Sequence, residues 1–402
     1  MDLNTKGWLQ DYYDKVQNEG LAAIDQTFPG YEQMLYKMVQ PSGIMYGHPV
    51  KEIGSTGLLK NQLDPVARMK LIYADSMLRA GWIRLAEVDQ LKSDHKITQY
   101  LIPEMSEYFL SLYPNLYRGS SSSYVEKPYY LAETLISKRV SVKTSLVKNY
   151  LAHLFHNSML FIDVMLFGEW VKGMGSMSVI DLRAESSRFR LTVLGIMALA
   201  ASADKKLQQE ERALFEFYLE SAGVDSQTKK EARALLNGFG SLSEIDIPEI
   251  DSWLIRKYLL EMGILVTLAD KKINDPEQEF INELGGILGF DLSEISESML
   301  SVESFVLDNW GSMHYLLGRS NLDVISKRFM IRLKGFIDKN KNYVIQEIQE
   351  SKDLFYLLGK SRTKDLTDHE KRIVNEQLID ILKTITAFII LSLSLIHISE
   401  TT

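Results

Sequence analysis

Four carboxylates in the middle of the chain have the residue types and the spacing of a cation site. Asp204 and Glu211 occur in one segment, and Asp270 and Glu277 occupy the matching places 66 residues further on. Carboxylate oxygens of this kind suit a hard cation such as calcium. The same acids also suit helix ends, because an anion in the first turn interacts favourably with the helix dipole. Metal binding and a purely structural role therefore both stay open.

These acids lie in an internal repeat. Residues 198–225 align without a gap with residues 264–291, and both copies contain Ala-Asp-Lys-Lys, at 203–206 and 269–272. Each copy predicts a helix that ends near the Ala-Asp pair, a short loop and a second helix. The repeat therefore predicts two related helical hairpins.

The second helix of each copy has a clear stop signal. Gly223 and Gly289 suit the left-handed position that follows a helix end. Asp225 and Asp291 come two residues later, where an aspartate side chain can cap the next helix. The pattern therefore predicts a third helix directly after each glycine.

The repeat resembles the TerB-like domain, a helical module associated with tellurite resistance whose hallmark is a twice-repeated A-D-G-x-I-x-x-x-E pattern. The resemblance covers residues 188–300. It implies a compact helical bundle with an acidic, cation-binding cluster at the four carboxylates. Lys205 and Lys271 stand where the family usually has glycine, which is a departure from its loop pattern.

Helical periodicity dominates the chain and strand alternation is nearly absent, so the predicted fold is all-α. Asp64-Pro65 is a typical helix start, with the carboxylate as cap and the ring in the first turn. The expected organisation is an N-terminal helical region, central helices that pack with it, the TerB-like repeat domain, a basic amphipathic arm and a non-native tail, at residues 1–117, 124–185, 186–305, 321–390 and 391–402.

One long apolar helix is expected at residues 142–170. Polar residues such as Asp163 interrupt it, which favours a buried core helix over a membrane span. His153 and His156 are three residues apart on one face, a spacing that can hold a metal. No third ligand is identifiable nearby, so two packed or capped histidines are the alternative.

The C-terminal part of the chain is basic and then apolar. Residues 321–390 contain thirteen Lys or Arg against ten Asp or Glu, although the whole chain has a net charge of −8. A basic helix beside an apolar run suits anionic phospholipid headgroups. The run at 384–396 would span about 20 Å as a helix, which is shorter than the roughly 30 Å hydrocarbon core. It is therefore expected to lie in the membrane interface.

The start of this segment resembles the entry to the transmembrane helix of the leucine-zipper/EF-hand transmembrane (Letm) family. The matching residues are Leu366, Thr367, Glu370, Lys371, Gln377, Leu378, Asp380, Lys383, Thr384 and Ile385. Thr386 replaces the expected proline. A TerB-like domain before a Letm-like end is similar to bacterial Letm-related, biofilm-associated proteins, and the non-native tail suggests a truncated C-terminus. For mitochondrial members the family implies potassium or calcium exchange against protons, but that activity is not carried over to this chain, because one partial helix cannot build an exchanger.

Several function classes are excluded or disfavoured. The chain has no cysteine, so disulfides, thiolate metal sites and cysteine nucleophiles are excluded. Its acidic balance disfavours a nucleic-acid partner. It contains no P-loop, G-x-S-x-G or HExxH motif, so no enzymatic activity and no cofactor other than calcium or a similar hard cation is expected.

The sequence therefore predicts a membrane-associated accessory or scaffold protein. Its body is expected in the cytoplasm, attached to the inner membrane at the C-terminus, with the membrane and other proteins as partners. The alternatives are a component of a cation/proton transport system and a soluble cation-binding stress-response protein. Further membrane spans in an intact gene would favour the transport alternative.

Overall fold

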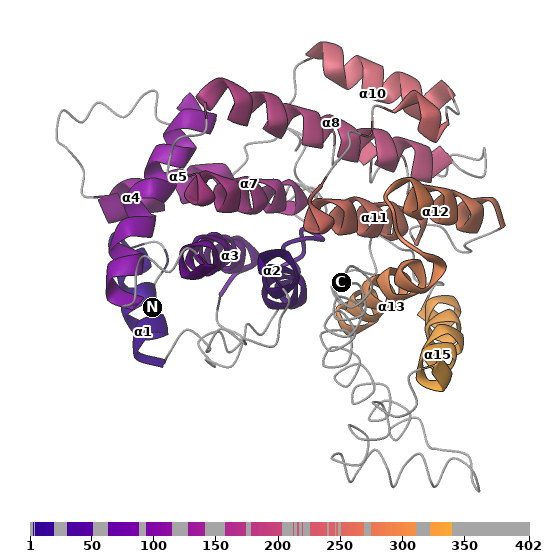
Figure 1. The fold of residues 1–402 in the computed structure, drawn as a ribbon, viewed down its shortest axis with the longest axis horizontal. Coiled ribbons are helices and arrows are strands. Elements are labelled where there is room, and N and C mark those ends of the chain that lie inside the picture. The colour runs from indigo at the N-terminus through magenta and orange to yellow at the C-terminus, as the bar shows by residue number, and fades with distance from the viewer. Residues whose placement is uncertain are drawn as a thin grey trace, which may run out of the picture. The chain divides into compact units, whose positions relative to one another are not determined.

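The computed structural model describes residues 3, 5–19, 30–50, 63–87, 94–114, 128–140, 157–173, 178–202, 212, 215–216, 219, 226–238, 241–245, 247, 251–268, 275–310 and 322–339. Within these residues the regular elements are helices and no strand occurs, so the predicted all-α fold is confirmed. The chain divides into two compact units, Met1–Met262 and Gly263–Thr402. Figure 1 labels the helices of both units.

The first unit contains most of the described helices. In chain order they are α1 (Trp8–Glu19), α2 (Tyr31–Val39), η1 (Gln40–Ser42), α3 (Pro65–Glu87), α4 (Asp94–Leu112), α5 (Pro128–Val140), η3 (Asn157–Met159), α7 (Leu160–Lys172), α8 (Val179–Ser202), α10 (Ser226–Gly238), η4 (Leu242–Glu244) and the first part of α11 (Trp253–Thr267).

Helix α7 lies at the centre of the first unit. Nearly all of its side chains are buried, including Asp163. Helix α3 packs extensively against α7, and α4 and α8 contact it as well (Figure 1). A buried core helix was expected over a longer range, and the described helix begins at Leu160. His153 and His156 lie outside the described residues.

Side-chain caps fix the starts of two helices in this unit. The Asp64 carboxylate accepts hydrogen bonds from the Val66 and Ala67 amides at 2.9 and 3.0 Å, so the predicted start of α3 is confirmed. The start of α1 is capped from a distant helix, because the Glu133 carboxylate of α5 accepts the Gly7 and Leu9 amides at 3.0 and 2.9 Å. These caps satisfy amides that have no partner inside the helix.

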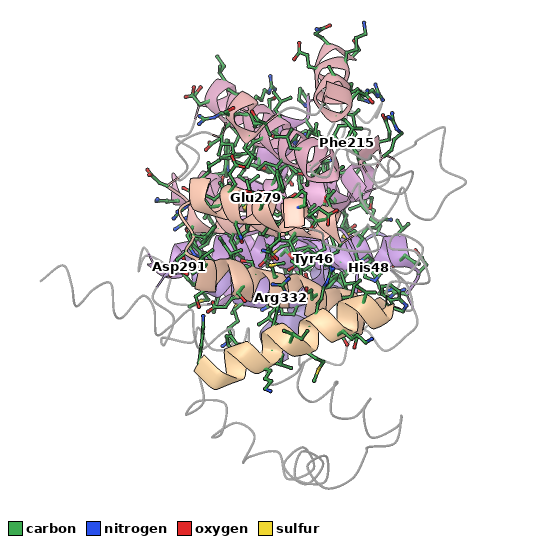
Figure 2. The ribbon with its side chains drawn as sticks, turned by 90° about the vertical axis from the view of Figure 1, so that its right-hand side faces the viewer. Tyr46, His48, Phe215, Glu279, Asp291 and Arg332 are labelled. Carbon is green, nitrogen blue, oxygen red and sulfur yellow. The ribbon has the colours of Figure 1, made fainter. Side chains whose placement is uncertain are left out.

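The second unit contains three described helices after α11, namely α12 (Asp275–Ile287), α13 (Leu292–Asp308) and α15 (Leu322–Lys339). The turn between α12 and α13 has the predicted form. Gly289 adopts a φ of 76°, and the Phe290 amide donates to the Gly285 carbonyl at 2.8 Å, which is the bond of a Schellman helix end. Asp291 then caps α13 in a reciprocal capping box with Glu294 (Figure 2).

Glycine at position 285 allows α12 and α13 to pack closely. A Cβ atom there would overlap the side chain of Ile295 on α13. The glycine is therefore a helix-packing contact between α12 and α13.

The basic helix α15 packs against α13. Four apolar side chains recur on one face and are buried, namely Ile325, Phe329, Leu333 and Phe336, whereas Met330 and Ile331 are exposed. On this helix Arg332 forms an ion pair with Glu303 of α13, with Nε and Oε1 3.2 Å apart (Figure 2). The apolar face of this part of the predicted arm is therefore covered by protein. Residues 340–402, which carry the Letm-like pattern and the apolar run, lie outside the described residues.

Candidate functional site

A buried carboxylate joins the helices that surround α7. Asp163 is fully buried and accepts hydrogen bonds from the Tyr73 and Tyr113 hydroxyls at 2.8 and 2.5 Å. It also pairs with Arg139 at 2.9 Å and with Arg190 at 3.0 Å. These partners come from α3, the residue after α4, α5 and α8. Asp163 therefore holds these segments together around α7.

The charge of this carboxylate is stabilised by its partners. Burial by itself raises the pKa of Asp163, but the guanidiniums of Arg139 and Arg190 outweigh it and hold the pKa below its ordinary value. The Tyr113 ring lies 4.7 Å from the Arg139 guanidinium carbon, within cation–π range. The group is saturated with donors and closed to solvent, so its role is structural.

A second buried carboxylate attaches α11 to the N-terminal helices. Glu261 accepts hydrogen bonds from the hydroxyls of Tyr36 and Tyr46 at 2.5 and 2.6 Å. Lys257 forms an ion pair with the same carboxylate, with Nζ 3.9 Å from Oε1. Burial raises the pKa of Glu261, although Lys257 and the two hydroxyls partly oppose the rise. This cluster positions the start of α11 beside α2.

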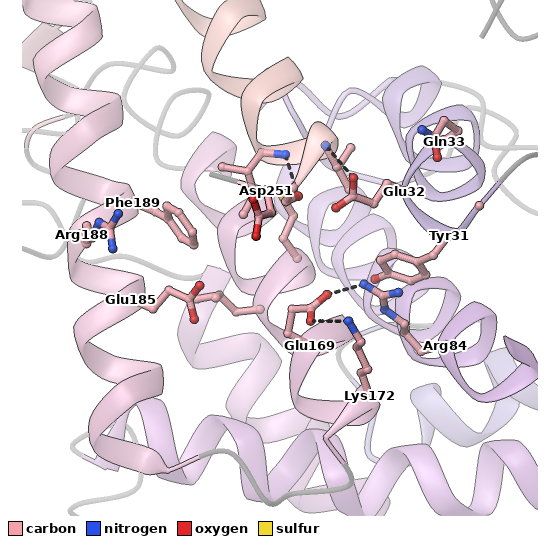
Figure 3. Close-up of a pocket in the computed structure, with 16 residues that line it drawn as sticks. Tyr31, Glu32, Gln33, Arg84, Glu169, Lys172, Glu185, Arg188, Phe189 and Asp251 are labelled. Atoms are coloured by element: carbon pink, nitrogen blue, oxygen red, sulfur yellow. Dashed lines mark hydrogen bonds and ion pairs between the residues drawn. The ribbon is translucent and has the colours of Figure 1, made fainter. Parts of the chain in front are cut away.

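The ends of these helices enclose a pocket of about 590 Å³ in the first unit (Figure 3). Its walls come from α2, α3, α7, α8 and the start of α11. The polar side chains that line it are Tyr31, Glu32, Gln33, Arg84, Glu169, Lys172, Glu185, Arg188, Asp251 and Ser252. Charges of both signs therefore face one cavity.

One wall of the pocket is a fixed stack of charges and an aromatic ring. The Arg84 guanidinium carbon lies 3.3 Å from the centre of the Tyr31 ring, and Arg84 forms an ion pair with Glu169. Lys172 approaches the same carboxylate at 3.7 Å (Figure 3). A Cβ atom at residue 168 would overlap the Tyr31 side chain, so glycine there allows the ring to lie against α7.

The opposite wall is formed by α8. Glu185 is half-buried, and Arg188 and Phe189 follow it on the same helix (Figure 3). Burial raises the pKa of Glu185, and the negative charge of Glu169 across the pocket raises it further, although the positive charge of Arg188 partly opposes the rise. Within the described residues Glu185 has no hydrogen bond or ion pair, so its charge is compensated less than that of Glu169.

The start of α11 forms the end of the pocket and is already capped. The Ser252 hydroxyl accepts the Ile255 amide at 3.2 Å, and the Glu32 carboxylate of α2 accepts the Leu254 amide at 3.2 Å. These two side chains occupy donors that could otherwise bind an anion. The helix start therefore offers little to a phosphate or a carboxylate ligand.

The four predicted metal ligands are only partly described. Asp204, Glu211 and Asp270 lie outside the described residues. Glu277 is buried on α12 with 1% of its surface exposed. Among the described residues no group of three or more candidate ligands comes together. The predicted cation site therefore stays a prediction.

The sequence does not single out the pocket residues, because they come from five separate helices. In the sequence pattern Asp163 is only an interruption of an apolar helix. An isolated aspartate among apolar residues is a signal of a paired buried charge, but its partners cannot be identified from spacing.

Comparison with known proteins identifies a domain in the middle of the chain. Residues 190–299 match the family model described as Tellurite resistance protein TerB. A TerB domain is therefore present, and it begins at Arg190, one of the two arginines that pair with Asp163. No curated protein and no solved structure matches the chain.

Within the described part of the chain, no helix is both long enough and apolar enough to cross a bilayer. The predicted interfacial segment at 384–396 lies outside the described residues.

Proposed function

We propose that this protein is a helical accessory protein that binds a ligand or a partner side chain without transforming it. The observation that carries the proposal is the composition of the pocket. Its lining combines opposite charges with the apolar side chains of Met165, Leu166, Phe189, Leu254 and Ile255, and none of the described lining residues is a histidine. Such a mixed cavity is typical of recognition by shape and charge.

The arrangement of the polar groups supports binding over catalysis. A nucleophile needs an adjacent base that is itself oriented by a third group. The hydroxyl of Ser252 is used as a helix cap, and the carboxylate of Glu169 is used in ion pairs. The hydroxyl of Ser252 and the carboxylate of Glu169 are thus committed to positions in the fold.

The binding proposal is tested by methyl NMR of the full chain against a panel of small metabolites and short peptides. We expect a ligand to shift the methyl signals of Met165 and Ile255, which line the pocket, and to leave Ile136 on α5 unchanged. The ligand should be recovered chemically intact after long incubation. The proposal would be contradicted if no compound of the panel shifted the methyl signals of the pocket, or if a ligand were chemically converted.

The proposal includes attachment of the protein to the inner membrane through its C-terminal sequence, with the body in the cytoplasm. Its support is the run of apolar residues at 384–396 and the basic residues before it. Burial of apolar surface in the interface contributes roughly 25 cal/mol per Å², and lysines add a salt-sensitive attraction to anionic lipid. The TerB domain would then act beside the membrane.

Co-sedimentation with anionic vesicles tests the attachment. We expect the full chain to bind and a chain that ends at Lys383 to lose most of the binding. The second chain keeps the basic helix α15, so it is the matched control for electrostatic attraction alone. Equal sedimentation of the two chains would exclude a role for the apolar run.

A further inference from the structure

The charges of the pocket separate into committed and available groups. Glu169 is neutralised by Arg84 and Lys172, and Glu32 is occupied by the Leu254 amide. The groups left without a hydrogen bond or ion pair within the described residues are Glu185, Asp251 and Arg188. Two of these three carry negative charge, so the available part of the pocket is acidic.

The three available groups differ in their exposure to solvent. Asp251 and Arg188 are exposed to solvent, whereas Glu185 is half-buried. Water solvates the charges of Asp251 and Arg188. It solvates the charge of Glu185 less, because burial removes part of the hydration of this carboxylate. The nearby carboxylate of Glu169 adds repulsion, which the exposed guanidinium of Arg188 offsets only in part. A positive group placed beside Glu185 would relieve both costs.

The pocket also has an apolar lining. Phe189 follows Glu185 by one helical turn, and Met165, Leu166 and Ile255 are further lining residues, all of them buried. An alkyl chain can lie along such a surface while its charged end reaches a polar group. An anion would find only exposed Arg188, since the other cations are paired and the α11 amides are capped.

We propose that the pocket binds an alkyl ammonium or guanidinium group, with the positive end at Glu185 and the alkyl chain against Phe189 and Met165. This inference rests on the binding function proposed above and specifies its ligand class. Two sources carry this chemistry, a lysine or arginine side chain of a partner protein and a free polyamine. The geometry assigns the cation to Glu185 in either case.

The proposal is tested by titrating the full chain with Nα-acetyl-lysine methylamide and with spermidine, followed by methyl NMR. Nα,Nε-diacetyl-lysine methylamide is the matched neutral probe, because it keeps the alkyl chain and removes the charge. We expect both cations to shift Met165 and Ile255, and the neutral probe to bind about tenfold more weakly. Tighter binding of the lysine derivative identifies a protein side chain as the source, and tighter binding of spermidine identifies a polyamine.

Two variants locate the charge. Glu185→Gln should weaken cation binding about tenfold, whereas Asp181→Asn removes one exposed charge from the same helix and should leave it unchanged. Equal binding of charged and neutral probes, or equal loss in both variants, would overturn the assignment to Glu185. If neither cation binds while other compounds still shift the pocket methyls, the ligand class is wrong but the binding function stands. If no compound shifts them, both fail.

Discussion

Replacing Asp163 with alanine is expected to lower the free energy of unfolding by about 3–5 kcal/mol, because it leaves two buried guanidiniums without their counterion. Arg139 and Arg190 are buried in the first unit, and both depend on this carboxylate for compensation. Tyr73 and Tyr113 would also lose a buried acceptor. Urea denaturation followed by tryptophan fluorescence measures the effect.

Two controls distinguish loss of the charge from loss of bulk. Asp163→Asn keeps the shape and one acceptor oxygen, so it should remove much of the stability as well if the charge is what matters. Asp181→Ala removes an exposed aspartate from α8 and should change the free energy of unfolding by less than about 0.5 kcal/mol. An Asp163→Asn protein as stable as the wild type would show that the ion pairs contribute little.

Helix ends are the part of this fold that could be predicted from the sequence. Asp64-Pro65 starts α3, and Gly289 followed by Asp291 ends one helix and starts the next. These features depend on the backbone preferences of a few neighbouring residues. Such local chemistry can be interpreted without knowing what the segment packs against.

The contacts that define the interior could not be predicted in this way. Asp163 meets Tyr73 from a distance of 90 residues along the chain, and Glu261 meets Tyr36 from 225 residues. No spacing rule links such positions, because only the tertiary packing brings them together. The pocket also depends on tertiary packing, since one wall comes from α3 and α7 and the opposite wall comes from α8.

The basic helix α15 shows a related limit of sequence patterns. Its alternation of charge and apolar residues suits a membrane surface and a protein surface equally. In the second unit its apolar face lies against α13, and Arg332 is paired with Glu303. An amphipathic pattern thus predicts a partner surface but does not identify which surface it is.

The pairing of α15 with α13 is expected to weaken as the pH rises from about 4.5 to 7. Glu303 is fully buried, and burial raises its pKa to about 7 although Arg332, and to a smaller extent Arg328, oppose the rise. Its ordinary value is 4.5, so the folded unit binds an extra proton between about pH 4.5 and 7. Its contribution to stability is therefore present below pH 4.5 and is lost as the pH rises to 7. The loss corresponds to about 3 kcal/mol.

Glu303→Gln isolates this contribution, because glutamine resembles the protonated acid at every pH. Hydrogen exchange of the α15 amides, corrected for intrinsic rates, measures the opening free energy of wild type and variant from pH 4.5 to 8.5. We expect the variant to gain about 3 kcal/mol relative to the wild type across this range, whatever its offset at low pH. Glu279→Gln, at an exposed glutamate of α12 (Figure 2), is the matched control and should give a constant difference.

The charged groups that face Glu303 are Arg328 and Arg332, and Glu277 acts on Arg328. A difference between Glu303→Gln and wild type that does not change with pH would mean that Arg332 compensates the buried carboxylate in full, and α15 would then be held equally at both ends of the range.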